Sequence, residues 1–155
     1  AIALLEARGF TAEDFARSHP GGRLGRRLLL HVGDMMHRDA AMPVITADMP
    51  LAEALLEISR KGLGIGVIVA STGEVAGVFT DGDLRRTIDR GLDIHRTPIG
   101  QVMTTPCQTI AAELLAAEAL RLMDERKINA LPVVDETQRL IGVLNMHDLL
   151  RAGVA

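Results

Sequence analysis

The chain contains one segment twice, and this internal repeat limits the folds that it can adopt. The copies are residues 32–86 and 99–151, and GVFTDGDL at residues 77–84 returns as GVLNMHDL at residues 142–149. Residue 32 corresponds to residue 99 at the opening, whereas Ala47 corresponds to Ala112, so the alignment needs a gap between the opening and the rest. A repeat unit of this length buries its apolar face by packing against its twin. We therefore expect two similar halves, with function in the clefts between them.

Composition narrows the class of protein. The 155 residues are 48% apolar, enough for one globular unit. No apolar run approaches the roughly 20 residues of a membrane span, and we expect no membrane interaction. The single cysteine, Cys107, is typical of a reducing cytoplasm and is interpreted as a small strand residue or, alternatively, as a reactive thiol. Because the chain begins with Ala1, we expect a piece of a longer protein.

Charge and aromatic content argue against nucleic-acid binding. The net charge is −3, and the chain has no Trp or Tyr and three Phe. Nucleic-acid binders are usually basic, and single-strand binders stack bases on aromatic side chains. The five histidines show no metal-ligand spacing, so we expect no metal and no cofactor.

Hydrophobic periodicity predicts the same element order in both copies. After a helical leader at residues 1–31, each copy is expected to form a β-α-β-β-α unit, with a small sheet and helices on one side. The fold class is α+β, with repeats at 32–92 and 99–155. In the first copy, Asp48 is the expected helix cap and Gly62 ends that helix, and residues 81–89 form the next helix. In the second copy, helices are expected at residues 113–126 and from Met146.

Two motifs mark the start of the last helix in each copy, Thr80-x-x-Asp83 and Asn145-x-x-Asp148. A Thr or Asn followed three residues later by an acid is a capping arrangement that satisfies free helix-end amides. The same carboxylate could accept hydrogen bonds from a ribose diol. Both interpretations can hold together, because a cap and a ligand contact use the same end of the helix.

Together with residues 130–135 (ALPVVD), the doubled motif resembles the CBS domain, and the tandem resembles a CBS pair, or Bateman module. This resemblance covers about residues 32–152 and implies a regulatory module that binds adenosine nucleotides or related ligands between its repeats. It implies a first cleft built from Thr80, Asp83, Met103, Gln108, Asn129 and Ala130. It also implies a second cleft built from Asn145, Asp148, Pro43, Gly64 and Ile65. Asn145 departs from the Thr or Ser that is usual in the family. Arg85 and Arg86, which follow the first motif, are interpreted either as a solvated face or as anchors for an anionic ligand.

The leader narrows the resemblance. Residues 9–26, with His19-Pro20-Gly21-Gly22, resemble the junction in D-arabinose-5-phosphate isomerases, which join a sugar isomerase domain to a CBS pair. The resemblance implies that His19 belongs to the isomerase active site, whereas the residues alone favour a helix-end histidine before a proline. Since the rest of that site is absent, we expect no enzymatic activity from this chain.

The resemblance also implies a pathway and an effector. The parent enzyme would convert ribulose 5-phosphate to arabinose 5-phosphate for 3-deoxy-D-manno-octulosonate (Kdo) and lipopolysaccharide, in the cytoplasm. We expect CMP-Kdo as the ligand, with AMP or ATP next, and a homodimer of CBS pairs within a tetrameric enzyme. The alternative is a passive dimerisation module with no physiological ligand.

Overall fold

The computed structural model describes residues 29–154, which form two similar halves. The first half contains α4 (Val32–Met35), a 3-10 turn (Asp39–Ala41), β1 (Val44–Ile45), α5 (Leu51–Lys61), β2 (Gly66–Val69), β3 (Val75–Phe79) and α6 (Asp81–Asp89). The second half contains a 3-10 turn (Ile99–Gln101), β4 (Ile110–Ala111), α7 (Ala116–Arg126), β5 (Ala130–Val134), β6 (Leu140–Asn145) and α8 (Met146–Arg151). The helical leader and His19 lie mainly or wholly outside the described residues.

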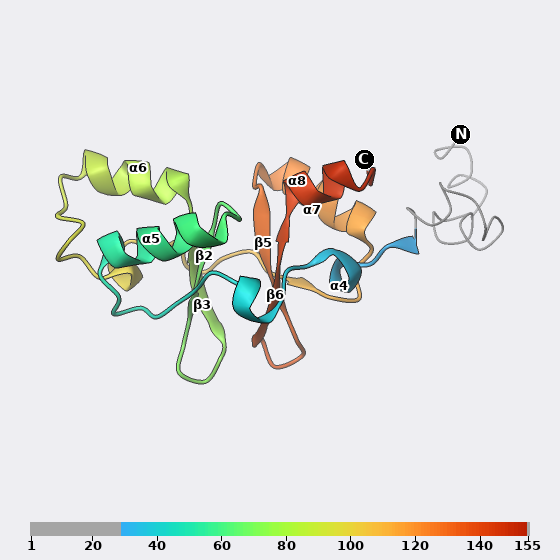
Figure 1. The fold of residues 1–155 in the computed structure, drawn as a ribbon, viewed down its shortest axis with the longest axis horizontal. Coiled ribbons are helices and arrows are strands. Elements are labelled where there is room, and N and C mark those ends of the chain that lie inside the picture. Colours follow the sequence, from blue (N-terminus) through green and yellow to red (C-terminus); the bar gives the residue numbers. More distant parts are fainter. Residues whose placement is uncertain (1–28, 155) are drawn as a thin grey trace.

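Each half has its own three-stranded sheet. The orders are β1-β2-β3 and β4-β5-β6, with a parallel first pair and an antiparallel second pair in both. The registers match, since Ile68 pairs with Gly77 in the first sheet and Val133 pairs with Gly142 in the second. Figure 1 shows α5, α6, α7 and α8 on one side, while the two hairpins project to the other. The α+β class and the β-α-β-β-α order predicted from the sequence are confirmed.

The opening of each copy packs on the opposite half. Val32 N–H donates to Leu114 O at 2.8 Å, and Ile99 N–H donates to Met49 O at 2.9 Å. Val32 and Met36 are buried in the core of the second half, whereas Ile99 is buried in the core of the first. Each opening segment thus belongs to the core of the opposite copy.

Two glycines make room for the exchanged methionines. A Cβ at Gly142 would overlap Met36 Sδ, and a Cβ at Gly77 would lie 2.7 Å from Met103 Sδ. Both approaches are far closer than any van der Waals contact. The equivalent glycines of β3 and β6 therefore let each opening segment lie against the other copy's last strand.

A third core joins the halves. Leu63, Ile65 and Val67 of the first copy are buried together with Val143 of the second. The hairpins are also linked, since Leu140 N–H donates to Gly73 O at 3.0 Å. The two copies thus form one packed body with a shared interface.

The helix starts differ from the sequence prediction. Asp48 is exposed and does not cap α5, which begins at Leu51 after Pro50. Its first amides are satisfied by the linker between the copies, because Leu51 N–H donates to Thr97 O and Ala52 N–H donates to Ile94 O, both at 2.9 Å. Helix α7 begins at Ala116 rather than at residue 113, and Ala116 N–H donates to Leu30 O at 2.8 Å. Backbone carbonyls from distant segments replace side-chain caps at both helices.

The prediction at the other end of α5 is confirmed. Gly62 follows the last residue of the helix with φ of 70° and donates its N–H to Ile58 O at 3.1 Å. Left-handed backbone favours glycine, which is why a helix commonly stops there. Helix α6 spans Asp81–Asp89, as predicted. Within residues 29–154 no helix combines the length and apolarity needed to cross a membrane.

Candidate ligand-binding site

A cavity of about 410 Å³ lies between the two copies. Its wall combines the end of β3 and the start of α6 with the loop that enters the second copy. The loops ahead of β2 and β5 complete it. The lining residues are Gly64, Ile65, Val78, Thr80, Asp81, Gly82, Thr104, Pro106, Cys107, Gln108, Lys127, Ile128, Asn129, Ala130, Leu131 and Pro132. This inter-repeat cavity has the size of a small-molecule site and draws its wall from both repeats.

Thr80 and Asp83 form a capping box at the start of α6, as one of the two interpretations of the motif predicted. Thr80 N–H donates to Asp83 Oδ2 at 3.0 Å. The other carboxylate oxygen, Oδ1, accepts from Thr104 Oγ1 and from the Arg86 guanidinium, each at 2.6 Å. Asp83 is 4% exposed, and its two oxygens are both engaged. The carboxylate therefore joins α6 to the segment that enters the second copy.

Counting Arg85 and Arg86 with the first cleft, four of its eight expected ligand-binding residues line the inter-repeat cavity. Thr80, Gln108, Asn129 and Ala130 lie in its wall. Asp83, Arg85, Arg86 and Met103 are not among the lining residues.

The other half have different surroundings. Met103 packs against the core of the first half, and Arg86 is paired with Asp83. Arg85 is exposed on α6. The two arginines, considered from the sequence as anchors for an anionic ligand, thus lie outside the wall of the cavity.

The residues expected in the second cleft are divided between two places. Gly64 and Ile65 line the inter-repeat cavity with Thr80, not a separate site with Asn145 and Asp148. Pro43 is buried beside β1, where its carbonyl accepts from Val67 N–H at 2.9 Å. The loop before β2 faces the first cavity because the shared core brings it against the second copy.

The polar groups of the second motif contact protein atoms. Asn145 Nδ2 donates to Leu63 O at 2.8 Å, and Asn145 Oδ1 accepts from His147 N–H at 2.7 Å. Asp148 Oδ2 lies 2.5 Å from His37 Nε2. His37 is the counterpart of Thr104 in the repeat, and each forms an antiparallel bridge with the opposite copy, to Val143 and Val78 respectively. The two motifs therefore hold equivalent junctions between the copies, with different partners.

Ten residues of the cavity wall were not expected from the sequence, among them Asp81, Thr104 and Lys127. Alignment of the copies offered a signal for Lys127, which stands where the first copy has Gly62. No local pattern marked Thr104, because its contact to Asp83 depends on the exchange of the opening segments. Cys107 also lines the cavity, and burial raises the pKa of its thiol, which favours the protonated form over a reactive thiolate.

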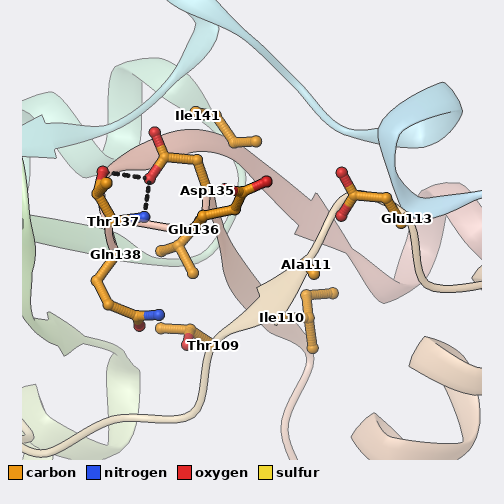
Figure 2. Close-up of a pocket in the computed structure, with 10 residues that line it drawn as sticks. Thr109, Ile110, Ala111, Glu113, Asp135, Glu136, Thr137, Gln138 and Ile141 are labelled. Atoms are coloured by element: carbon orange, nitrogen blue, oxygen red, sulfur yellow. Dashed lines mark hydrogen bonds between the residues drawn. The ribbon is translucent and has the colours of Figure 1, made fainter.

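A second cavity, of about 540 Å³, lies at the hairpin end of the second sheet. Figure 2 shows the turn residues Asp135 and Thr137 on one side of it and Glu113 on the other. Hydrogen bonds from the Thr137 side chain and the Arg139 and Thr137 backbone hold the pKa of Asp135 below its usual value. The carboxylate organises the turn, and the acidic wall, which includes Glu136, disfavours phosphate. We therefore place the candidate site in the inter-repeat cavity.

Metal-ligating side chains do not gather anywhere in the described part of the chain. Among residues 29–154 no group of three or more His, Cys, Asp or Glu side chains could hold a metal ion. The inter-repeat cavity is lined by hydroxyl, amide, ammonium, carboxylate and apolar groups. Such a wall suits hydrogen bonding to an organic ligand.

Comparison with known proteins identifies both repeats. The model of the CBS domain family, described as "CBS domain", matches residues 32–90 and 99–155. Arabinose 5-phosphate isomerase KdsD of Pseudomonas aeruginosa is 60% identical over 154 residues, which are 99% of this chain and 47% of that protein. The protein of the same name from Escherichia coli K12 is 53% identical over 154 residues, which are 99% of this chain and 47% of that protein. The chain thus spans about half the length of the curated relatives that it matches.

Solved structures share the fold. The crystal structure of CBSX2 in complex with AMP superposes with a TM-score of 0.68 at 25% identity, over 81% of this chain and 96% of that one. An uncharacterized conserved protein from Pyrococcus horikoshii superposes with a TM-score of 0.70 at 26% identity, over 80% of this chain and 92% of that one. Both likenesses extend across the two repeats.

Proposed function

The chain belongs to the CBS domain family, and we propose that it is the nucleotide-sensing regulatory part of an arabinose 5-phosphate isomerase. The observation that carries the proposal is the inter-repeat cavity of about 410 Å³, whose wall includes Thr80, Gln108 and Asn129. A ligand that contacts both repeats at once stabilises one arrangement of the pair over others. Such a ligand would bias the part of the enzyme to which the pair is joined.

The wall suits a nucleoside. Ile65, Val78, Leu131 and Pro132 supply apolar surface for a base, and the chain offers no Trp or Tyr for stacking. Thr80, Gln108 and Asn129 supply hydroxyl and amide groups for ribose hydroxyls or phosphate oxygens. Aliphatic packing together with a few hydrogen bonds fits a mononucleotide better than a wholly apolar ligand.

Asp83 gives the proposed sensor a coupling element. Its Oδ1 already accepts from Thr104 Oγ1 at 2.6 Å, so a ribose diol that binds Asp83 must displace that hydroxyl. Ligand binding would then exchange a contact between the copies for a contact to the ligand. Since the Thr104 segment enters the second copy, the exchange alters how the copies are joined, which is the differential interaction that regulation requires.

The preferred ligand is CMP-Kdo, with AMP or ATP next. The relatives named arabinose 5-phosphate isomerase support this choice, because CMP-Kdo would be a feedback effector of a Kdo pathway. AMP is supported by its presence in the CBSX2 structure, at 25% identity. In this proposal the parent enzyme interconverts ribulose 5-phosphate and arabinose 5-phosphate in the cytoplasm.

The test is a thermal-shift and calorimetric titration of the chain with CMP-Kdo, CMP, AMP and ATP. A ligand at a hundredfold its dissociation constant stabilises by about 2.7 kcal/mol, which raises Tm by roughly 5–10 °C for a protein of this size. Gln108→Ala removes an exposed amide from the wall and should reduce the shift. Gln101→Ala is the matched control, since Gln101 is exposed outside the wall. No shift and no heat with any of the four ligands would refute the sensing function.

A specific observation favours assembly as a second candidate function. Leu56, Ile88 and Leu150 are 69%, 60% and 49% exposed on α5, α6 and α8. These helices lie on the same side of the sheets (Figure 1). We propose that this side joins two copies of the pair, within a tetramer of the whole enzyme. Sedimentation should show a dimer that Leu56→Glu and Ile88→Glu convert to a monomer, whereas a monomeric parent chain would exclude the assembly role.

A further inference from the structure

Lys127 occupies an unusual position in the wall of the inter-repeat cavity. It directly follows α7 and has φ of 56°, in the left-handed region. Its counterpart in the first copy, Gly62, has φ of 70°. Left-handed backbone favours glycine, and the first copy uses glycine to end its helix. The turn alone therefore does not explain a lysine at residue 127.

No other protein group engages the Lys127 side chain in the described region. It is exposed, and among residues 29–154 its ammonium forms no ion pair or hydrogen bond. Lys61, which ends α5, differs, because its Nζ lies 3.5 Å from Glu57 Oε1 and also donates to Ala40 O. The charge of Lys127 is thus available to a ligand.

The cavity wall has one charge of each sign among its lining residues, all of which lie in the described region. Lys127 carries the positive charge and Asp81, in the first turn of α6, carries the negative one. Arg86 is paired with Asp83, and neither Arg85 nor Arg86 lines the cavity. A bound anion would therefore meet Lys127 rather than the arginines that follow the first motif.

We infer that Lys127 binds the phosphate of the nucleotide and makes the inter-repeat cavity selective for nucleotides over neutral nucleosides. The inference rests on the proposed function and names the residue whose ammonium group contacts the negative charge of the ligand. A lysine ammonium acts on phosphate as a mobile point charge with three donors. Asn129, two residues along the same loop, lies in the wall beside it and supplies an uncharged amide. The strained backbone at residue 127 is retained because glycine there would lose this contact.

The experiment compares phosphorylated and unphosphorylated probes by calorimetry. CMP and cytidine, and AMP with adenosine, are titrated into the whole chain and into its Lys127→Gln, Lys127→Arg and Lys127→Gly variants. Lys127→Gln keeps the backbone strain and an unbranched polar side chain, shorter by one atom, but removes the charge. Arg96→Gln is the matched control, since it removes the same charge from an exposed linker residue outside the wall.

Lys127→Gln should weaken CMP or AMP binding about tenfold, the usual size of a hydrogen bond to a charged group. Cytidine or adenosine should bind the variant within about twofold of the parent chain. Lys127→Arg should restore most of the loss, and Arg96→Gln should cause none. Raising the salt concentration should weaken CMP binding to the parent chain but much less to Lys127→Gln.

Two results would overturn the inference while leaving nucleotide sensing intact. One is an equal loss of CMP and cytidine in Lys127→Gln, which would mean a purely structural role. The other is an affinity for CMP and AMP that Lys127→Gln leaves unchanged. Lys127→Gly separates misfolding from lost recognition, because it relieves the backbone and should fold at least as well as the parent chain. Failure of the parent chain to bind these four probes, and CMP-Kdo and ATP as well, would instead refute the proposed function.

Discussion

The two acids at the helix starts, Asp83 and Asp148, occupy equivalent positions but have different partners. Asp83 is 4% exposed and is held by Thr104 and Arg86, whereas Asp148 is 26% exposed and lies 2.5 Å from His37 Nε2. Thr104 and His37 are themselves counterparts, and each comes from the opening segment of the other copy. At the first junction, a threonine hydroxyl donates to a buried carboxylate that lies beside the inter-repeat cavity. At the second junction, a histidine ring contacts a partly exposed carboxylate.

The two junctions differ in their side chains while their backbones stay alike. Backbone contacts at the two junctions are alike, since Val78 and Val143 each bridge to the exchanged segment. Because each acid meets a side chain from the other copy, one substitution in an opening segment changes the chemistry of the opposite motif. The first motif thereby lies beside the candidate site, while the second is used to hold the halves together.

The largest effect is expected at the glycines that admit the exchanged segments. Gly77→Ala places a Cβ 2.7 Å from both Met103 Sδ and Thr104 O, whereas Gly142→Ala meets mainly the flexible Met36 side chain. Overpacking costs about 1–3 kcal/mol, and backbone yields less than a methionine. Gly77→Ala should therefore destabilise more than Gly142→Ala in urea unfolding.

Second-site variants test the physical cause of that difference. Met36→Ala should recover part of the loss in the Gly142→Ala protein. Met103→Ala should recover less in the Gly77→Ala protein, because the clash with the Thr104 carbonyl remains. Equal losses and equal rescue in the two copies would show that the exchange is energetically symmetric.

The next largest difference is expected in the loss of stability when the two acids, Asp83 and Asp148, are replaced by alanine. Asp83→Ala removes the capping box and the buried acceptor of Thr104, which together cost about 2 kcal/mol. Asp148→Ala breaks a partly exposed contact to His37 and should cost about 1 kcal/mol or less. Chemical denaturation of the two variants at one pH measures this difference. A larger loss for Asp148→Ala would reverse the ranking of the two junctions.

A smaller effect is expected on ligand affinity. Thr104→Val removes the hydroxyl that competes for Asp83 and should strengthen nucleotide binding about three- to fivefold, at a cost of about 1 kcal/mol in stability. Thr105→Val is the matched control, because Thr105 Oγ1 donates to Ala76 O at 2.7 Å, away from Asp83. His37→Val removes the equivalent contact, to Asp148, and should leave the affinity for nucleotide unchanged. Weaker binding by Thr104→Val would mean that Thr104 contacts the ligand directly.

The smallest effect is expected at the hairpin turns. The second turn is held by Asp135, whose pKa is lowered chiefly by the Thr137 hydroxyl, whereas the equivalent residue in the first turn is Ala70. A lowered folded-state pKa stabilises above the unfolded value, and this stability is lost as the pH falls through the folded value. Asp135→Asn should thus lower Tm slightly at pH 7, and the difference should shrink as the pH falls below the ordinary value of 3.8 and vanish below the lowered folded-state value. A difference that stays the same from pH 7 down through the acid range would contradict this assignment.

Much of the fold followed from local patterns, as α5 and α6 illustrate. Helix α6 occupies residues 81–89, as predicted, because the capping box and the left-handed Gly91 just beyond its end mark it locally. The end of α5 at Gly62 followed from the same kind of signal. Its start did not, because the acceptors of its first amides are carbonyls of Ile94 and Thr97, more than thirty residues away.

The candidate site was predictable only in part for the same reason. Thr80, Gln108, Asn129 and Ala130 followed from the doubled motif and the family resemblance, and they share the cavity. Gly64 and Ile65 join them, because their loop packs into the core shared by the halves. Lys127 carried a signal in the repeat alignment, as a lysine opposite a glycine, but its place in the wall depends on that packing.

By itself the sequence determined the doubling, the element order, the capping box of α6 and the end of α5 at Gly62, since these depend on periodicity and on residues a few positions apart. Only the tertiary structure decided that the copies exchange their openings, that Thr104 and His37 meet the acids of the opposite motifs, and that Gly64 and Ile65 line the inter-repeat cavity together with Thr80. Contacts between distant segments depend on how Gly77 and Gly142 admit the exchanged methionines, which is a matter of packing. Such packing cannot be inferred from a local sequence pattern, because the residues in contact are far apart in the chain.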